Sequence, residues 1–339
     1  MKPKTKRILR IVCMLALTVF LFWTVNLLFM PKYIEKDPDG RITAEFYREK
    51  LNNDVIFTGS STVYAGINPI TLWKEYGLTS YDRSNSSQTA WIAYYMIKDA
   101  IAVAKPKLVV LDVGFFYVAD DYAEEAENRK TLDDMRIGRE KFQCMKTVMT
   151  EDETVKDYLF PILRFHTRWK YLTAEDFKYL YYKPSVTYNG YIRSDLVEPA
   201  AAEKKEENLQ DVRLSNRNGL FLENILQLCR DEQIPVLLIK TPSHDPKWGD
   251  EFEADLKFVA DPYGVDYINF DDYTDEIGLD YSKDTPDGGG HLNASGAEKF
   301  SKYLGAYLTE HFTLTDHRND PAYVKVWQEK CERYDNGQQ

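Results

Sequence analysis

The sequence has few of the residues from which disulfide-built domains and metal sites are made. Its 339 residues include five histidines and four cysteines, which are Cys13, Cys144, Cys229 and Cys331. No CxxC pair and no Cys/His spacing typical of a metal site occurs. Cys13 lies in an apolar run and the other three are far apart, so a disulfide fold is excluded, although one bridge among Cys144, Cys229 and Cys331 stays open. We expect no metal and no cofactor.

Positive charge is scarce beyond the N-terminus. Residues 1–36 hold seven Lys or Arg and one acidic residue, whereas the remainder holds 36 basic and 53 acidic residues, a balance of −17. Such a domain is a poor candidate for binding nucleic acid, although a local basic pocket is compatible with it. A composition of 44% hydrophobic and 14% aromatic residues is typical of a folded protein.

One long uncharged run, IVCMLALTVFLFWTVNLLFM, covers residues 11–30. Its 20 residues match the roughly 20 that a helix needs to cross a bilayer. The basic residues before it are Lys2, Lys4, Lys6, Arg7 and Arg10. They predict a cytoplasmic N-terminus. A cleaved signal peptide is the alternative, but its apolar region is usually ~7–15 residues and no small-x-small cleavage site follows this run. We therefore expect a single-pass anchor in the cell membrane over residues 1–36, with an extracytoplasmic domain.

Short apolar runs alternate with helical patterns along the rest of the chain. The predicted strands are 54–58, 79–83, 107–113, 235–240 and 265–269, and the main predicted helices are 89–105, 218–231, 251–261 and 294–312. This alternation predicts an α/β domain, with a central parallel sheet of about five strands covered by helices on both faces.

Three further segments complete the expected organisation. Residues 123–213 interrupt the alternation, and we expect a helical insertion over 123–185 followed by an exposed loop over 186–213. The domain would end at residue 312, and 313–339 would form a polar C-terminal tail with one short helix. Ser295 and Glu298 have the spacing of a capping box for the last helix of the domain.

The stretch "DVIFTGSSTVYAGINP", residues 54–69, places Gly59, Ser60 and Ser61 directly after the first predicted strand. In open parallel sheets, ligands bind beyond the carboxyl ends of the strands. A phosphate-binding loop would need GxxxxGK[ST], and no lysine occurs here. Two interpretations remain: a serine nucleophile presented by the turn, or a serine that only caps the following helix.

A serine nucleophile needs a base. His291 lies in "DTPDGGGHLNASG", where three glycines precede it and Asp287 stands four residues before it. A carboxylate beside an imidazole orients it and stabilises its charged form. His244, in a loop after a strand, is a weaker candidate. The alternative for His291 is a surface residue in a glycine-rich turn before the last helix.

Together, the two stretches resemble the SGNH (GDSL-like) hydrolase superfamily over residues 54–312. "GSS" stands where most members have Gly-Asp-Ser, as in the membrane-anchored, DltD-like branch. The resemblance implies a three-layer α/β/α sandwich and a serine that carries an acyl group. It maps the nucleophile to Ser61 and the base to His291.

The match departs from the family at the remaining catalytic positions. Position 288 is glycine where the family has its aspartate. The group that orients His291 could therefore be Asp287 or Asp284, or the enzyme could work as a Ser–His dyad without a carboxylate. The oxyanion donors implied are the backbone N–H groups of Ser61 and Ser87. Phe116 replaces the asparagine that donates to the oxyanion in the family, and Asn85 or a residue of the insertion could substitute for it.

The insertion contains "LRFHTRWKYL". It resembles a His-x-Arg-Trp motif of membrane-anchored SGNH-like proteins. The resemblance implies that His166 and Arg168 bind substrate, with the Arg168 fork on a phosphate or carboxylate. The alternative is that both lie on the surface of an amphipathic helix packed by Phe165 and Trp169.

These observations lead to one expectation and one alternative. We expect a serine esterase or O-acyltransferase acting on acetyl or D-alanyl esters of a bacterial cell-envelope polymer, such as an acylated polysaccharide or a teichoic-acid-like chain. A membrane acyltransferase would be its partner. The alternative is a non-catalytic member of the same fold that binds glycan or assists such an acyltransferase.

Overall fold

The computed structural model describes residues 3–33, 37–201, 212–244 and 248–337, and its core is one parallel sheet. The strands are β1 (Val55–Thr58), β2 (Ser80–Asp82), β3 (Leu108–Asp112), β4 (Val236–Lys240) and β5 (Tyr267–Asn269), in the order β2-β1-β3-β4-β5. The five predicted strands and the α/β class are thus confirmed.

Alternate residues of the strands bury themselves on opposite faces of the sheet. Val55 and Phe57 of β1 pack with α4 (Pro69–Tyr76) and α14 (Ala294–His311). On the other face, Val109 and Leu111 of β3 pack with the remaining large helices. Those helices are α5 (Ala90–Ala104), α11 (Asn216–Asp231) and α12 (Asp250–Ala260). A sheet covered on both faces explains why its central strands β1, β3 and β4 are mostly apolar and fully buried.

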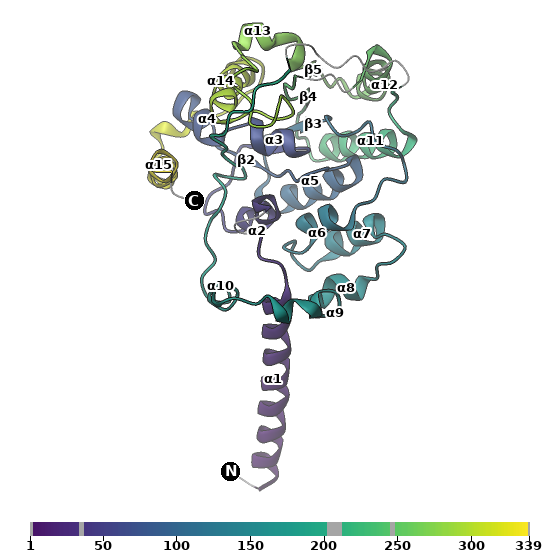
Figure 1. Cartoon of the computed structure of the whole chain (residues 1–339), viewed down its shortest axis with the longest axis vertical. Coiled ribbons are helices and arrows are strands. Elements are labelled where there is room, and N and C mark those ends of the chain that lie inside the picture. Colours follow the sequence, from purple (N-terminus) through teal and green to yellow (C-terminus); the bar gives the residue numbers. More distant parts are fainter. Residues whose placement is uncertain (1–2, 34–36, 202–211, 245–247, 338–339) are drawn as a thin grey trace.

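The predicted insertion is a set of short helices between the sheet layers and the N-terminal helix (Figure 1). They are α6 (Glu125–Leu132), α7 (Arg139–Val148), α8 (Val155–Leu159), α9 (Pro161–Phe165), the 3-10 helix η2 (His166–Lys170) and α10 (Ala174–Lys178). The loop expected to be exposed is partly buried, since Thr187 to Tyr191 lie inside the domain. Positions 202–211 of that loop fall outside the described residues.

The N-terminal helix α1 (Pro3–Phe29) extends away from the domain, and it is long and apolar enough to cross a membrane. At the other end of the chain, the predicted tail forms α15 (Pro321–Asp335). Trp327 of α15 is buried and stacks on Trp73 of α4 with ring centroids 5.1 Å apart, so the tail is part of the packed domain.

The remaining short elements connect these layers. They are η1 (Pro38–Arg41), α2 (Ile42–Phe46), α3 (Ser61–Gly66), η3 (Asp261–Tyr263), η4 (Phe270–Tyr273), α13 (Thr274–Ile277) and η5 (His317–Asn319). All four cysteines of the chain lie in the described part and are free thiols, so no disulfide joins Cys144, Cys229 and Cys331.

Candidate active site

The turn between β1 and α3 presents Ser61 as the first residue of the helix. Gly59 has φ 151°, and a Cβ atom there would lie only 2.6 Å from the Cβ of Asp112 at the end of β3. Glycine is therefore required for β1 and β3 to end side by side. Ser60 occupies the N-cap position, but its side chain makes no capping hydrogen bond and instead lies 3.1 Å from the hydroxyl of Thr62. The alternative that Ser60 is the N-cap is therefore confirmed for its position, although its side chain does not cap the helix.

Ser61, His291 and Asp287 form a continuous chain of polar contacts. The Ser61 hydroxyl oxygen lies 2.7 Å from Nε2 of His291, and Nδ1 of the same ring lies 2.5 Å from a carboxylate oxygen of Asp287. The other Asp287 oxygen accepts the backbone N–H of His291 at 3.0 Å. Partial burial raises the pKa of Asp287, but the hydrogen bonds and charge of His291 outweigh it, so that pKa lies below its usual value. Asp287 is therefore ionised beside the imidazole at neutral pH.

Glycines explain how an aspartate four residues before the histidine reaches it. Gly288 and Gly289 both have left-handed backbones, with φ 77° and 110°. The Gly289 N–H donates to the Thr285 hydroxyl at 2.7 Å, which closes the loop tightly. A side chain at Gly289 would also collide with the Cβ of His244 at 2.3 Å. His244 therefore packs against the loop that carries His291, and the structure does not place its ring in contact with Ser61.

Asp284, the alternative carboxylate, is engaged elsewhere. It is buried, accepts the Ser295 hydroxyl at 2.7 Å and the Lys299 amine at 2.6 Å, and so braces the start of α14. The N-cap of α14 is Asn293, whose side chain accepts the backbone N–H of Ser295 at 3.1 Å. The predicted Ser295 capping box is wrong. The Ser295 hydroxyl donates to Asp284, and the Glu298 carboxylate accepts from Lys302, so neither side chain caps the helix.

Three residues bear on the expected oxyanion site: Ser87 and Asn85 as candidate donors, and Phe116 in place of the asparagine of the family. Ser87 is half-buried in the turn before α5 with φ 53°, an uncommon conformation for a residue other than glycine. Phe116 is fully buried in the core below α5 and α11, where it offers no donor. The side-chain amide of Asn85 is buried and lies 2.6 Å from the hydroxyl of Thr131 on α6, so it ties the turn to the insertion.

Asp112 is a residue that the sequence reasoning missed. It ends β3 beneath the Ser61 turn and accepts the backbone N–H groups of Thr241 at 2.7 Å and Gly114 at 2.8 Å, as well as the Thr62 hydroxyl at 3.3 Å. Burial raises the pKa of Asp112, and these hydrogen bonds partly offset the rise. Asp112 thus joins the ends of β1, β3 and β4. The signal in the sequence was an acidic residue at the end of an otherwise apolar strand.

His166 and Arg168 belong to η2, between α9 and α10, and these two helices lie beside the end of α1, away from α3 (Figure 1). The Arg168 guanidinium donates to the carbonyls of Phe29 at 2.8 Å and Met30 at 2.7 Å, and to Asp176 at 3.0 Å. It therefore satisfies carbonyls that the end of α1 leaves open. His166 is exposed, and the structure does not bring either residue to Ser61, so their expected place at the Ser61 site is corrected. Trp169 is exposed rather than packed.

Comparison with known proteins adds little to this geometry. No family model and no curated protein matches the chain. A solved structure from Bacteroides fragilis that bears the provisional name of an acylhydrolase aligns with 79% of this chain and 94% of its own, at 12% identity and a TM-score of 0.36. That score is too low to support an argument about fold or function. The functional assignment therefore depends on the residues of the site.

Proposed function

We propose that the protein is a membrane-anchored serine esterase or O-acyltransferase whose α/β domain lies outside the cytoplasm. The observation that carries the proposal is the contact chain Ser61–His291–Asp287, in which residues 230 positions apart meet with the serine hydroxyl on one ring nitrogen and a carboxylate on the other. This is the order of nucleophile, base and orienting acid in a Ser-His-Asp catalytic triad.

The geometry suits an acyl transfer in two steps. The Ser61 oxygen attacks the acyl carbon while Nε2 of His291 takes its proton, and Asp287 stabilises the imidazolium. The backbone N–H groups of Ser61 and Ser87 are the proposed oxyanion donors. The bond to the leaving alcohol then breaks, and His291 returns the proton to that oxygen. Water or an acceptor hydroxyl next attacks the acyl-Ser61 carbon with His291 again as base, which releases Ser61.

The openness of the site favours a polymeric substrate. The side chains of His291 and Asp287 are 32% and 40% exposed, so an ester on a long chain can approach without entering a closed cavity. The resemblance to the SGNH superfamily suggests acetyl or D-alanyl esters on cell-envelope polymers. It also suggests a membrane acyltransferase as the partner that supplies or receives the acyl group.

A fluorophosphonate probe tests the nucleophile. We expect the purified full chain to react with the probe and to hydrolyse an activated acetyl ester. Ser61→Ala would abolish labelling and lower kcat/KM by about 10³–10⁶-fold, the range for loss of a triad serine. Ser60→Ala is the matched control, because its neighbouring hydroxyl contacts Thr62 and not His291, and it should keep wild-type labelling.

The alternative is a non-catalytic protein that binds glycan or assists an acyltransferase. Phe116 favours this alternative, because it is buried and stands where the family has an asparagine that donates to the oxyanion. Loss of one such donor lowers the rate of catalysis by ~10²–10³-fold. A folded wild-type chain that is neither labelled nor distinguishable from Ser61→Ala in the esterase assay would refute the enzymatic proposal in favour of this one.

A further inference from the structure

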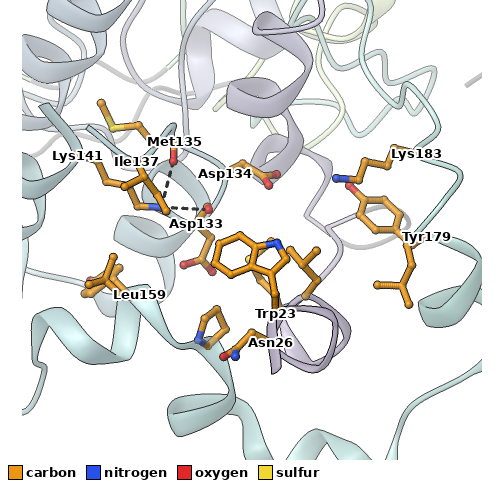
Figure 2. A pocket seen from close by; sticks show the side chains of 15 residues that line it. Trp23, Asn26, Asp133, Asp134, Met135, Ile137, Lys141, Leu159, Tyr179 and Lys183 are labelled. Carbon is orange, nitrogen blue, oxygen red and sulfur yellow. Dashed lines mark hydrogen bonds between the residues drawn. The ribbon is translucent and has the colours of Figure 1, made fainter. Parts of the chain in front are cut away.

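A cavity of about 180 Å³ lies where α1 enters the domain, far from the Ser61 site. Figure 2 shows it between Trp23 and Asn26 of α1 on one side and the insertion on the other. Asn26 is buried, and its side-chain oxygen accepts the backbone N–H of Ile162 on α9 at 3.3 Å. This contact shows that α1 packs against the insertion, so the cavity is enclosed between two parts of the protein that contact each other.

One part of the cavity is apolar and continues from the membrane helix. Trp23 and Leu27 line it from α1, Met30 lines it from just beyond the end of α1, and Ile137 and Leu159 line it from the insertion. Its volume exceeds the ~150 Å³ of an engineered apolar cavity that takes up benzene. It can thus hold a segment of an alkyl chain whose remainder lies along α1 in the bilayer.

The other part of the cavity is lined by the Tyr179 hydroxyl and the Lys183 amine, and two further cations lie close behind Tyr179. Tyr179 lines it and is 6% exposed, and its hydroxyl has no hydrogen-bond partner among the residues described. Three cations surround its ring: the Arg41 guanidinium 5.1 Å from the centroid, and the amines of Lys32 and Lys183 each 5.7 Å from it. Burial raises the pKa of Tyr179, so the hydroxyl remains a neutral donor.

The acidic groups at this end pair with other cations and leave Lys183 without an ion pair among the described residues. Asp134 pairs with Arg41. Burial raises the pKa of Asp133 to about 7, despite the nearby Arg129 and Lys141. The Lys141 amine donates to the backbone carbonyls of Asp133 and Met135. Burial lowers the pKa of Lys32 to about 8, so most of its population is charged at pH 7.

The surrounding surface has the composition of a membrane interface. Residues 155–183, here named the foot, contain exposed aromatic side chains at Trp169, Tyr171, Phe177, Tyr181 and Tyr182. Trp and Tyr are enriched where proteins meet lipid headgroups. The foot also carries six Lys or Arg and three acidic residues, in contrast to the acidic domain around it. It lies beside the end of α1 in Figure 1, at the level where α1 would leave a bilayer.

We propose that this cavity binds one anionic membrane phospholipid. Part of an acyl chain occupies the apolar portion, and the phosphate accepts hydrogen bonds from the Tyr179 hydroxyl and the Lys183 amine. The bound lipid and the aromatic foot would hold the domain in one orientation above the membrane. The proposal requires α1 to span the membrane and is independent of the chemistry at Ser61.

Lipid titration of the full chain in mild detergent, read by native mass spectrometry, tests the proposal. We expect dioleoyl phosphatidylglycerol to bind at one site and about tenfold more tightly than dioleoyl phosphatidylcholine. Lys183→Gln and Tyr179→Phe should each weaken phosphatidylglycerol about tenfold, since each removes a hydrogen bond to a charged group. Lys178→Gln is the matched control, because Lys178 is on the same foot, pairs with Glu175 and does not line the cavity.

A second variant tests the apolar portion. Ile137 is exposed at the cavity rim, so Ile137→Asn should leave folding intact and weaken both lipids. Unchanged phosphatidylglycerol binding in Lys183→Gln and Tyr179→Phe would overturn the proposal, as would inorganic phosphate competing as well as the lipid. Ser61→Ala should bind lipid like the wild type, so failure here is distinguishable from failure of the catalytic proposal.

Discussion

At the scale of single residues, Asp82 at the end of β2 is a carboxyl group in an unfavourable environment. Its side chain is fully buried, and neither carboxylate oxygen has a hydrogen-bond partner among the described residues. Burial raises the pKa of Asp82 well above its usual value. The folded protein therefore keeps a proton on this carboxyl at pH values where the unfolded chain has released it.

This proton makes stability depend on pH in a definite direction. Where the native state binds more protons than the unfolded state, the free energy of unfolding falls as pH rises. The contribution of Asp82 is therefore most favourable near pH 4 and is lost as pH rises towards the folded pKa. Asp82→Asn removes the titration, so its stability relative to wild type should improve steadily as the pH rises from 4 to 8.

Thermal or denaturant unfolding of both proteins at pH 4, 6 and 8 measures the difference. A gap between Asp82→Asn and wild type that does not change with pH would contradict the raised pKa.

Residue patterns predicted part of the candidate site. A serine after the first strand and a histidine in a glycine-rich turn, together with the family resemblance, pointed to Ser61 and His291, with Asp287 as one of the candidate carboxylates. The structure brings these three residues together. Their catalytic roles remain proposals. The choice between Asp287 and Asp284 could not be made from sequence, because it depends on the left-handed glycines and on which carboxylate meets Lys299.

At the scale of elements, the insertion is held together by a buried ion network around Arg129. The guanidinium contacts Glu125 at 2.9 Å and Asp133 at 3.4 Å, and it lies 4.3 Å from the ring centroid of Tyr158. Helices α8 and α9 have five residues each, too few to be stable alone. Tertiary contacts such as these must therefore order the foot.

Arg129→Met should destabilise the insertion by about 3–5 kcal/mol, because it leaves buried carboxylates without their partner. Hydrogen exchange followed by mass spectrometry should show faster exchange over residues 125–180 and little change in the sheet strands. Arg213→Met is the control, since its pair with Asp255 lies at the surface and should leave exchange almost unchanged. Equal protection of the insertion in Arg129→Met and wild type would show that apolar packing alone orders it.

The spacing of apolar residues and the length of the apolar runs predicted the large helices and the strands well, but predicted the foot poorly. The strands and α5, α11, α12 and α14 lie within a few residues of their predicted bounds, because each buries a face whose apolar pattern is continuous. The foot takes its structure from contacts with α1, including the bond of Asn26 to Ile162 and those of Arg168 to the end of α1. Arg168 was expected at the substrate because no local pattern shows such distant contacts.

At the scale of the whole molecule, the insertion separates α1 from the sheet layers (Figure 1). The α3 turn that carries Ser61 is therefore on the far side of the insertion from α1. In the proposed orientation, the foot meets lipid headgroups while the Ser61 site faces away from the bilayer. This arrangement suits a substrate that extends outward from the membrane better than one embedded in it.

Cysteine labelling on intact bacterial cells tests on which side of the membrane the domain lies. Phe258 on α12 is 83% exposed, so Phe258→Cys should react with a membrane-impermeant maleimide if the domain is extracytoplasmic. Thr5→Cys should react only after permeabilisation, because the basic residues around it favour the cytoplasm. Wild type gives the background from its own thiols, of which Cys144 and Cys229 are buried and Cys331 is half-buried. The reverse pattern would place the Ser61 site in the cytoplasm, where envelope polymers do not reach it, and would refute both the extracytoplasmic location and the proposed substrate class.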